Sequence, residues 1–181
     1  MKNRLILITG PKHSGKSMTA LALAKIIGGE AADLDDIVER QTGKTPRALF
    51  KEGAEVFRKA ETRALASMIR GKGGIIATGG GLIDNNEALA LLDGRRDLIF
   101  VYLDVSPETA WQRILAVGDE LPPFLNTENP RVKPKETHLA LHKRRAEAYK
   151  ALAHLTVFAE NKSSEEIAEE ILKRCAASFT F

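Results

Sequence analysis

The sequence has almost no cysteine, no long hydrophobic run and no large excess of either charge. Cys175 is the single cysteine among 181 residues, so no disulfide can close within the chain and a reducing, cytoplasmic setting is expected. The apolar run Leu5–Ile8 stops at Thr9–Gly10, which is too short for a membrane span or for the core of a signal peptide. The net charge is only +3, whereas nucleic-acid binding requires clustered positive charge. We therefore expect neither a membrane nor a nucleic acid as partner.

The remaining composition is that of an ordinary globular domain. Hydrophobic residues make up 44% and charged residues 28% of the 181-residue chain, which predicts one domain over residues 1–181 with a full core. Short apolar runs alternate with amphipathic segments, the pattern of an α/β protein with a mainly parallel sheet. Strands are predicted at Leu5–Thr9, Ala31–Leu34, Gly74–Thr78, Leu98–Asp104 and Leu155–Ala159.

Helices are predicted between the strands, each with a local signal in the sequence. Gly15–Ile27 has a helical composition and ends at Gly28, and Glu55–Ile69 carries an apolar stripe at helical spacing. Ser106–Pro107 marks the start of a further helix, and Ser163 and Glu166 form a capping box for the last one. Two stretches lack a regular pattern. Gln41–Glu52 is polar and predicted to be irregular, and Gly118–Pro134, with four prolines, is predicted to be a long loop serving as a lid. The basic cluster His142–Arg145 lies in a predicted helix, where such charges usually occupy a solvated face. A basic pocket for an anionic small molecule is the functional interpretation that we favour for it.

The segment Gly10–Ser17 matches the phosphate-binding pattern G-x-x-x-x-G-K-[ST] in full, after an apolar strand and before a helix. In this motif, the P-loop, backbone N–H groups surround a phosphate at the positive end of a helix. Lys16 is expected to reach the β- and γ-phosphates of ATP, and Ser17 to coordinate Mg²⁺. The absence of an N-K-x-D segment and the short chain favour a metabolite kinase over a GTPase or a motor. The residues predicted here to bind ATP are Gly10, Pro11, Lys12, His13, Ser14, Gly15, Lys16, Ser17 and Met18.

Three carboxylates, Asp33, Asp35 and Asp36, stand at the end of the second predicted strand. Asp33 and Asp35 are two residues apart, so both can face the crevice where open α/β sheets bind ligands. One can hold Mg²⁺ through water while the other accepts the proton of an attacking hydroxyl. The alternative is that these acids only cap the helix that follows, which is the role expected for Asp36.

Further motifs complete a pattern along the chain. Gly53–Glu61 begins a predicted helix, and Gly79–Gly81 follows the third predicted strand, where glycines let backbone amides approach a ligand. Near the C-terminus, Arg145 stands four residues before a tyrosine.

In order and spacing, from Leu5 to about Leu172, the sequence resembles the shikimate kinase family. That family has a P-loop, D-x-D, G-E-x-x-F-R-x-x-E (here one residue longer), G-G-G and an arginine four residues before a tyrosine.

The resemblance implies a three-layer α/β/α sandwich of the P-loop, nucleoside-monophosphate-kinase-like type, with a central five-stranded parallel sheet and a lid. It also implies a monomer that transfers the γ-phosphoryl group of MgATP to shikimate, with Lys16 neutralising charge. Asp35 would bind substrate hydroxyls and accept the proton, and Asp33 would assist Mg²⁺ binding. Arg58 and Arg145 would hold the substrate carboxylate. The other implied roles are substrate contacts by Gly79, Gly80 and Gly81, and adenine stacking by Arg113, for which a plain surface charge is the alternative.

The predicted lid departs from the family. The family lid carries R-P-L-L, whereas Leu121–Leu125 reads L-P-P-F-L, with proline at the position of the arginine. An arginine at the developing charge contributes ~10³-fold or more to phosphoryl transfer, and Arg131, Lys133 or Lys135 is the replacement that the sequence suggests. Three hypotheses remain: a shikimate kinase with a remodelled lid, a kinase of another small hydroxy acid or polyol, and a nucleotide-binding protein without catalysis.

Overall fold

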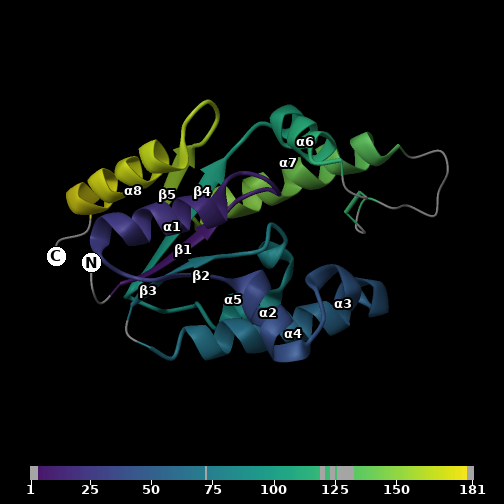
Figure 1. Ribbon diagram of the computed structural model, residues 1–181, viewed down its shortest axis with the longest axis horizontal. Coiled ribbons are helices and arrows are strands. Elements are labelled where there is room, and N and C mark those ends of the chain that lie inside the picture. The colour runs from purple at the N-terminus through teal and green to yellow at the C-terminus, as the bar shows by residue number, and fades with distance from the viewer. Residues whose placement is uncertain (1–3, 72, 119–120, 123–124, 126–132, 179–181) are drawn as a thin grey trace.

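The computed structural model describes residues 4–71, 73–118, 121–122, 125 and 133–178. At its centre is a five-stranded parallel sheet in the order β2-β3-β1-β4-β5 (Figure 1). The strands are β1 (Leu5–Thr9), β2 (Ala31–Asp33), β3 (Gly74–Ala77), β4 (Leu98–Asp104) and β5 (Leu155–Phe158). Each lies where the sequence predicts it, and the α/β fold with a central parallel sheet is confirmed.

Helices cover both faces of this sheet, which gives the predicted three layers (Figure 1). Helices α1 and α8 pack on one face, while α4, α5 and α7 contribute to the core on the other face. The helices are α1 (Lys16–Ile27), α2 (Leu34–Thr42), α3 (Pro46–Glu52), α4 (Ala54–Met68), the 3₁₀ turn η1 (Leu82–Asp84), α5 (Asn86–Ala90), α6 (Pro107–Ala116), α7 (Pro134–Leu152) and α8 (Ser164–Ser178).

The central strands are buried on both sides. In β1, Leu5 and Leu7 join the core beneath α4 and α7, while Ile6 and Ile8 join the core beneath α1 and α8. Successive side chains of a strand point to opposite faces, so a strand covered by helices on both faces needs apolar residues at every position. This requirement explains why the apolar runs in the sequence show no alternation.

The carboxyl ends of three strands meet at one edge of the sheet. Ala77 of β3 pairs with Ile8 of β1 on one side and with Asp33 of β2 on the other. The segments that follow these strands, beginning at Gly10, Leu34 and Thr78, therefore lie next to one another. This edge is where open α/β sheets bind their ligands.

The predicted helix ends are largely confirmed. Gly28 caps α1 in the left-handed conformation with φ 65°, and Ser106 accepts the N–H of Thr109 at the start of α6. Ser163 and Glu166 each accept the backbone N–H of the other, at 3.1 and 2.7 Å, which is the predicted capping box.

Two local predictions are wrong, and the usual solvated position of a basic cluster holds only in part. Gln41–Glu52 is not irregular, because α2 runs to Thr42 and α3 begins at Pro46, where Thr45 caps the helix by accepting the N–H of Ala48. The cap of α2 is Asp33 rather than Asp36, since Asp33 is the residue that precedes the first helical turn. The cluster His142–Arg145 is only partly solvated, since His142 is buried and the Arg145 side chain is 15% exposed.

Most of the predicted lid lies outside the described residues. Within Gly118–Pro134 the structure describes residues 118, 121–122, 125 and 133–134, and Pro134 occupies the first turn of α7. Pro122 and Leu125 are buried.

Candidate active site

The P-loop connects the end of β1 to the start of α1. Lys16 is folded back over this loop and donates from Nζ to the carbonyl oxygen of Pro11 at 2.8 Å. Ser14 is buried, and its backbone N–H donates to the same carbonyl at 3.2 Å. The loop and the first turn of α1 thus form a compact anion-binding element at the carboxyl edge of the sheet.

The ammonium group of Lys16 lies among charges of both signs. Burial lowers the pKa of Lys16 from 10.5 to about 8, an effect opposed by Asp35 and Asp33 and reinforced by Lys12. A partly desolvated ammonium group gains more from a phosphate than a hydrated one, because the local dielectric constant is lower.

Asp33 and Asp35 have separate partners. Asp33 Oδ2 accepts the hydroxyl of Ser17 at 2.5 Å, and its Oδ1 accepts the N–H of Asp35 at 2.9 Å. Ser17 and Asp33 therefore present a hydroxyl and a carboxylate side by side, a set of oxygen donors suited to Mg²⁺. Among the described residues no group of three or more His, Cys, Asp or Glu side chains forms a metal centre, so any ion here needs phosphate and water as further ligands.

Asp35 has the electrostatic character of a proton acceptor. Burial, Asp33 and Glu61 together raise the pKa of Asp35 from 3.8 to about 6, against the opposing charge of Lys16. Its Oδ1 is buried and has no hydrogen-bond partner within the described part of the chain. A carboxylate oxygen in this position can accept a hydroxyl of a ligand, and a pKa near 6 suits a general base.

Arg58 is held by a fully buried acid on its own helix. Glu61 Oε2 accepts from Arg58 Nη1 and from the side-chain amide of Asn85, each at 2.8 Å. The Glu61 side chain has an exposed fraction of 0%, so its negative charge depends on these partners. The pair fixes the guanidinium of Arg58 at the edge of the cavity.

Arg145 is held by an acid from another element. Its Nε and Nη2 donate to Oδ2 of Asp84 at 2.9 and 2.7 Å, and Arg144 contacts Oδ1 of Asp84 at 2.8 Å. Although burial alone would raise the pKa of Asp84, the guanidiniums of Arg145 and Arg144 hold it below its ordinary value. Asp84 therefore stays ionised and anchors the arginine of α7.

The two guanidiniums converge on Gly81. A Cβ at this position would lie 2.8 Å from Arg58 Nη2 and 3.1 Å from Arg145 Nη2. Only glycine leaves both guanidiniums in place, because the neighbouring atoms belong to side chains that are already anchored. Two forked donors at one point form a site for a carboxylate.

These groups line one cavity of about 270 Å³. It brings together most of the predicted site residues and adds others from α3, α4 and the lid segment. The lining residues are Lys12, Lys16, Ser17, Asp33, Asp35, Pro46, Arg47, Phe50, Phe57, Arg58, Glu61, Thr78, Gly79, Gly80, Gly81, Pro122 and Arg145.

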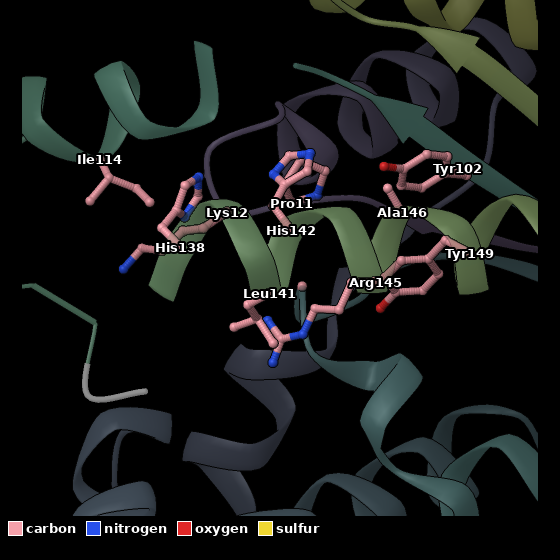
Figure 2. Close-up of a pocket in the computed structure, with 11 residues that line it drawn as sticks. Pro11, Lys12, Tyr102, Ile114, His138, Leu141, His142, Arg145, Ala146 and Tyr149 are labelled. Carbon is pink, nitrogen blue, oxygen red and sulfur yellow. The ribbon is translucent and has the colours of Figure 1, made fainter. Parts of the chain in front are cut away.

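A second, smaller cavity lies between the P-loop and α7. Figure 2 shows the side chain of Arg145 extending away from the ring of His142, which lines this cavity together with Pro11 and His138. Arg145 lines both cavities, whereas the two histidines line only the smaller one. The rings of His138 and His142 are 5.6 Å apart, and burial lowers the pKa of each.

Of the residues predicted to bind ATP, Lys12, Lys16 and Ser17 line the larger cavity. Pro11 lines the smaller one instead, and the others, which are Gly10, His13, Ser14, Gly15, Met18 and Arg113, line neither. Met18 is 59% exposed. Arg113 of α6 donates to the backbone carbonyl of His13 at 3.0 Å, which places it beside the P-loop.

Comparisons with known proteins agree over nearly the whole chain. The sequence model of the shikimate kinase family matches residues 12–176. A shikimate kinase of Thermobifida fusca (strain YX) is 36% identical over 175 residues, covering 96% of each chain. One of Actinobacillus pleuropneumoniae serotype 5b (strain L20) is 32% identical over 173 residues, covering 95% of each chain.

The chain belongs to the shikimate kinase family. A solved structure of the shikimate kinase from Acinetobacter baumannii in complex with shikimate superposes with a TM-score of 0.84, at 31% identity over 98% of this chain and 96% of that one. Family membership and the kinase-type fold are thus confirmed. Within the part of the chain that the structure describes, no helix has the length and apolar content of a membrane span.

Two carboxylates of the site, Glu61 and Asp84, were not predicted from the sequence. Glu61 was part of the quoted helix motif and stands three residues after Arg58, a spacing that places two residues on the same helix face and could have revealed the pair. Asp84 shares no element with Arg145 and lies 61 residues from it. No spacing rule connects those two positions.

Proposed function

We propose that this protein is an active shikimate kinase, which transfers the γ-phosphoryl group of ATP to a hydroxyl group of shikimate. The observation that carries this proposal is the shared cavity. Asp35 lies there with a buried carboxylate oxygen that has no hydrogen-bond partner among the described residues, in the same cavity as Lys16 of the P-loop and the two guanidiniums at Gly81. Shikimate combines a carboxylate with ring hydroxyls, so it offers one group to each of these parts of the cavity.

At the nucleotide end, the P-loop residues 10–17 bind the phosphates of ATP, and Arg113 of α6 stacks on the adenine. The donation from Lys16 to the Pro11 carbonyl keeps the ammonium group over the loop until phosphate replaces that carbonyl as its partner. Ser17 and Asp33 hold Mg²⁺, which when bound neutralises phosphate charge.

At the acceptor end, Arg58 and Arg145 bind the carboxylate of shikimate with forked hydrogen bonds. The glycines Gly79–Gly81 form the wall that lets the ring approach, and backbone N–H groups there are donors to it. This arrangement orients one ring hydroxyl toward Asp35.

Transfer proceeds in line, without a covalent enzyme intermediate. Asp35 accepts the proton of the attacking hydroxyl, while Lys16 remains protonated and stabilises the negative charge on the transferred oxygens. Closing the cavity with the lid segment, residues 118–134, excludes water from the reaction.

A single chain supplies every group in this scheme. Lys16 and Ser17 of the P-loop, both carboxylates and both guanidiniums line one cavity, which supports a single kinase domain over residues 1–181 that acts as a monomer. We place it in the cytoplasm, as expected from its single cysteine. A small anionic metabolite is its partner rather than nucleic acid or a membrane.

The test is coupled ADP release from MgATP with and without shikimate, with Lys16→Met as the blank. Shikimate-dependent turnover that disappears in Lys16→Met is the expected result. Intact ATP binding without stimulation by shikimate would contradict the proposal, and a screen of other small hydroxy acids and polyols would then identify the acceptor, if there is one.

A further inference from the structure

The cavity wall contains an arginine that none of these roles uses. Arg47 lies in the first turn of α3 and lines the cavity together with Lys16 and Asp35. Its Nη2 donates to the carbonyl oxygen of Leu121 at 3.3 Å. The neighbouring residue, Pro122, is buried and lines the same cavity. Arg47 thus connects α3 to the lid segment at the cavity itself.

The other cations of the cavity have positions of their own. Lys12 and Lys16 belong to the P-loop and approach a phosphate from the nucleotide side. Arg58 and Arg145 converge on Gly81, where the buried Glu61 and the partly exposed Asp84 anchor them. A phosphoryl group in transfer carries negative charge on three equatorial oxygens, and a guanidinium outside the P-loop stabilises this charge strongly.

The lid segment brings no such cation at the point where it meets Arg47. Residues 117–125 contain no lysine and no arginine. Of the three replacements that the sequence suggests, Arg131 lies outside the described residues, while Lys133 and Lys135 are exposed and do not line the cavity. Among the described residues, the arginines that line the cavity are Arg47, Arg58 and Arg145. Arg58 and Arg145 are engaged at Gly81, whereas Arg47 contacts the lid segment.

We propose that Arg47 is a catalytic residue, whose guanidinium binds the phosphoryl group during transfer. The proposal rests on the phosphotransferase function given above. In that reaction the bond from the γ-phosphorus to ADP breaks as the bond to the acceptor oxygen forms. The hydroxyl proton goes to Asp35, and Arg47 keeps its own protons throughout.

The experiment compares wild type, Arg47→Met, Arg47→Lys and Lys51→Met by steady-state kinetics with MgATP and shikimate. Lys51 is an exposed cation one turn farther along α3 and does not line the cavity, so Lys51→Met is the matched control for charge and helix stability. Arg47→Met is expected to lower kcat by about 100-fold or more, with both KM values within about threefold of wild type. Arg47→Lys keeps the charge without the fork and should recover part of the loss. Lys51→Met should leave kcat within about twofold of wild type.

Two results would overturn the assignment. One is a kcat for Arg47→Met close to that of Lys51→Met. The other is a raised KM for shikimate with kcat intact, because that pattern assigns Arg47 to binding of the acceptor. Melting temperatures are measured for all variants. If Arg47→Met does not fold, Arg47→Lys decides alone, since a natively folded Arg47→Lys with full kcat excludes the contact.

A second assay tests the role of Arg47 independently of the proposed function. It measures the slow hydrolysis of MgATP, in which water is the acceptor. If shikimate is not phosphorylated, the proposed function fails, and the release of inorganic phosphate above the Lys16→Met blank still reports on Arg47. A lower hydrolysis rate in Arg47→Met than in Lys51→Met supports the contact with the phosphoryl group. Equal rates overturn it.

Discussion

The two ends of the active-site cavity are built in different ways. The nucleotide end is one continuous segment, Gly10–Ser17, whose groups are held mainly by the backbone of the loop itself, as in the donation from Lys16 to Pro11. The acceptor end takes Asp35 from α2, Arg58 from α4 and Arg145 from α7, and ion pairs hold the arginines. A site formed by backbone depends on local conformation, whereas a site formed by ion pairs depends on each side chain.

This comparison predicts different responses to substitution. A change at the nucleotide end should abolish transfer altogether, because every acceptor needs the same phosphate geometry. A change at the acceptor end should act on one step or one ligand. The following predictions test that difference, beginning with the largest effect.

Lys16→Met should remove transfer, lowering kcat by ~10³-fold or more, because the ammonium group neutralises charge on the phosphates. Steady-state turnover measures it, and the melting temperature shows whether the fold is intact. Measurable transfer at more than a tenth of the wild-type rate would show that another cation of the loop, such as Lys12, performs this role.

Asp35→Asn should lower kcat by about 10²- to 10⁴-fold with little change in ATP binding, because the general base is lost. The folded-state pKa of Asp35, about 6, lies above its ordinary value of 3.8. The fold therefore loses stability as pH rises from 3.8 to about 6, and the full loss remains at higher pH, where the carboxylate is ionised in both states. The variant should therefore melt at a higher temperature than wild type at pH 8. Full activity would contradict the assignment of Asp35 as base.

The pH profile reports on both ends of the cavity. The ratio kcat/KM should rise as Asp35 loses its proton near pH 6 and fall as Lys16 loses its proton near pH 8. At pH 5 it should be about tenfold below the maximum. Bound phosphates favour the charged ammonium group, so the upper limb of kcat should lie at higher pH than that of kcat/KM. A flat kcat/KM between about pH 5 and 9 would contradict both titrations.

Among these predictions, Asp84→Asn should have the smallest effect on turnover. It leaves the partly buried guanidinium of Arg145 without its carboxylate and should destabilise the fold by about 1–3 kcal/mol, while kcat changes little. Shikimate supplies the missing carboxylate, so it should raise the melting temperature of the variant more than that of wild type. The control is Asp97→Asn, because Asp97 forms a more exposed pair with Arg95 at 2.7 Å. Equal destabilisation in both variants would show that Asp84 has no special place in the site.

Almost all residues of the nucleotide end were predicted from the sequence. Gly10–Ser17 is continuous, and the buried strand before it and the helix after it follow from apolar runs and local caps. Asp33 and Asp35 were also predicted, since their position after a strand places them at the edge of the sheet. The structure adds that Asp33 caps α2 and contacts Ser17 in the same geometry.

The acceptor end was predicted only where a motif exists. Arg58 and Arg145 were found through the family pattern. Asp84, which contacts Arg145 at 2.7 Å and Arg58 at 3.9 Å, follows from tertiary packing that no local pattern encodes. Arg47 was missed because Gln41–Glu52 was interpreted as irregular. A threonine cap with proline in the first turn is a helix signal, but seven residues are too few for a clear apolar stripe.

The pairing of Asp84 with Arg145 also determines when conformational entropy is lost. Arginine side chains are long, and immobilising one during binding costs roughly 0.5–1.5 kcal/mol. Because Asp84 and Glu61 already hold Arg145 and Arg58 in the empty cavity, this ordering occurs once, when the chain folds, and not at each encounter with substrate. The cavity is therefore preorganised, and a ligand carboxylate meets two donors whose directions are already set.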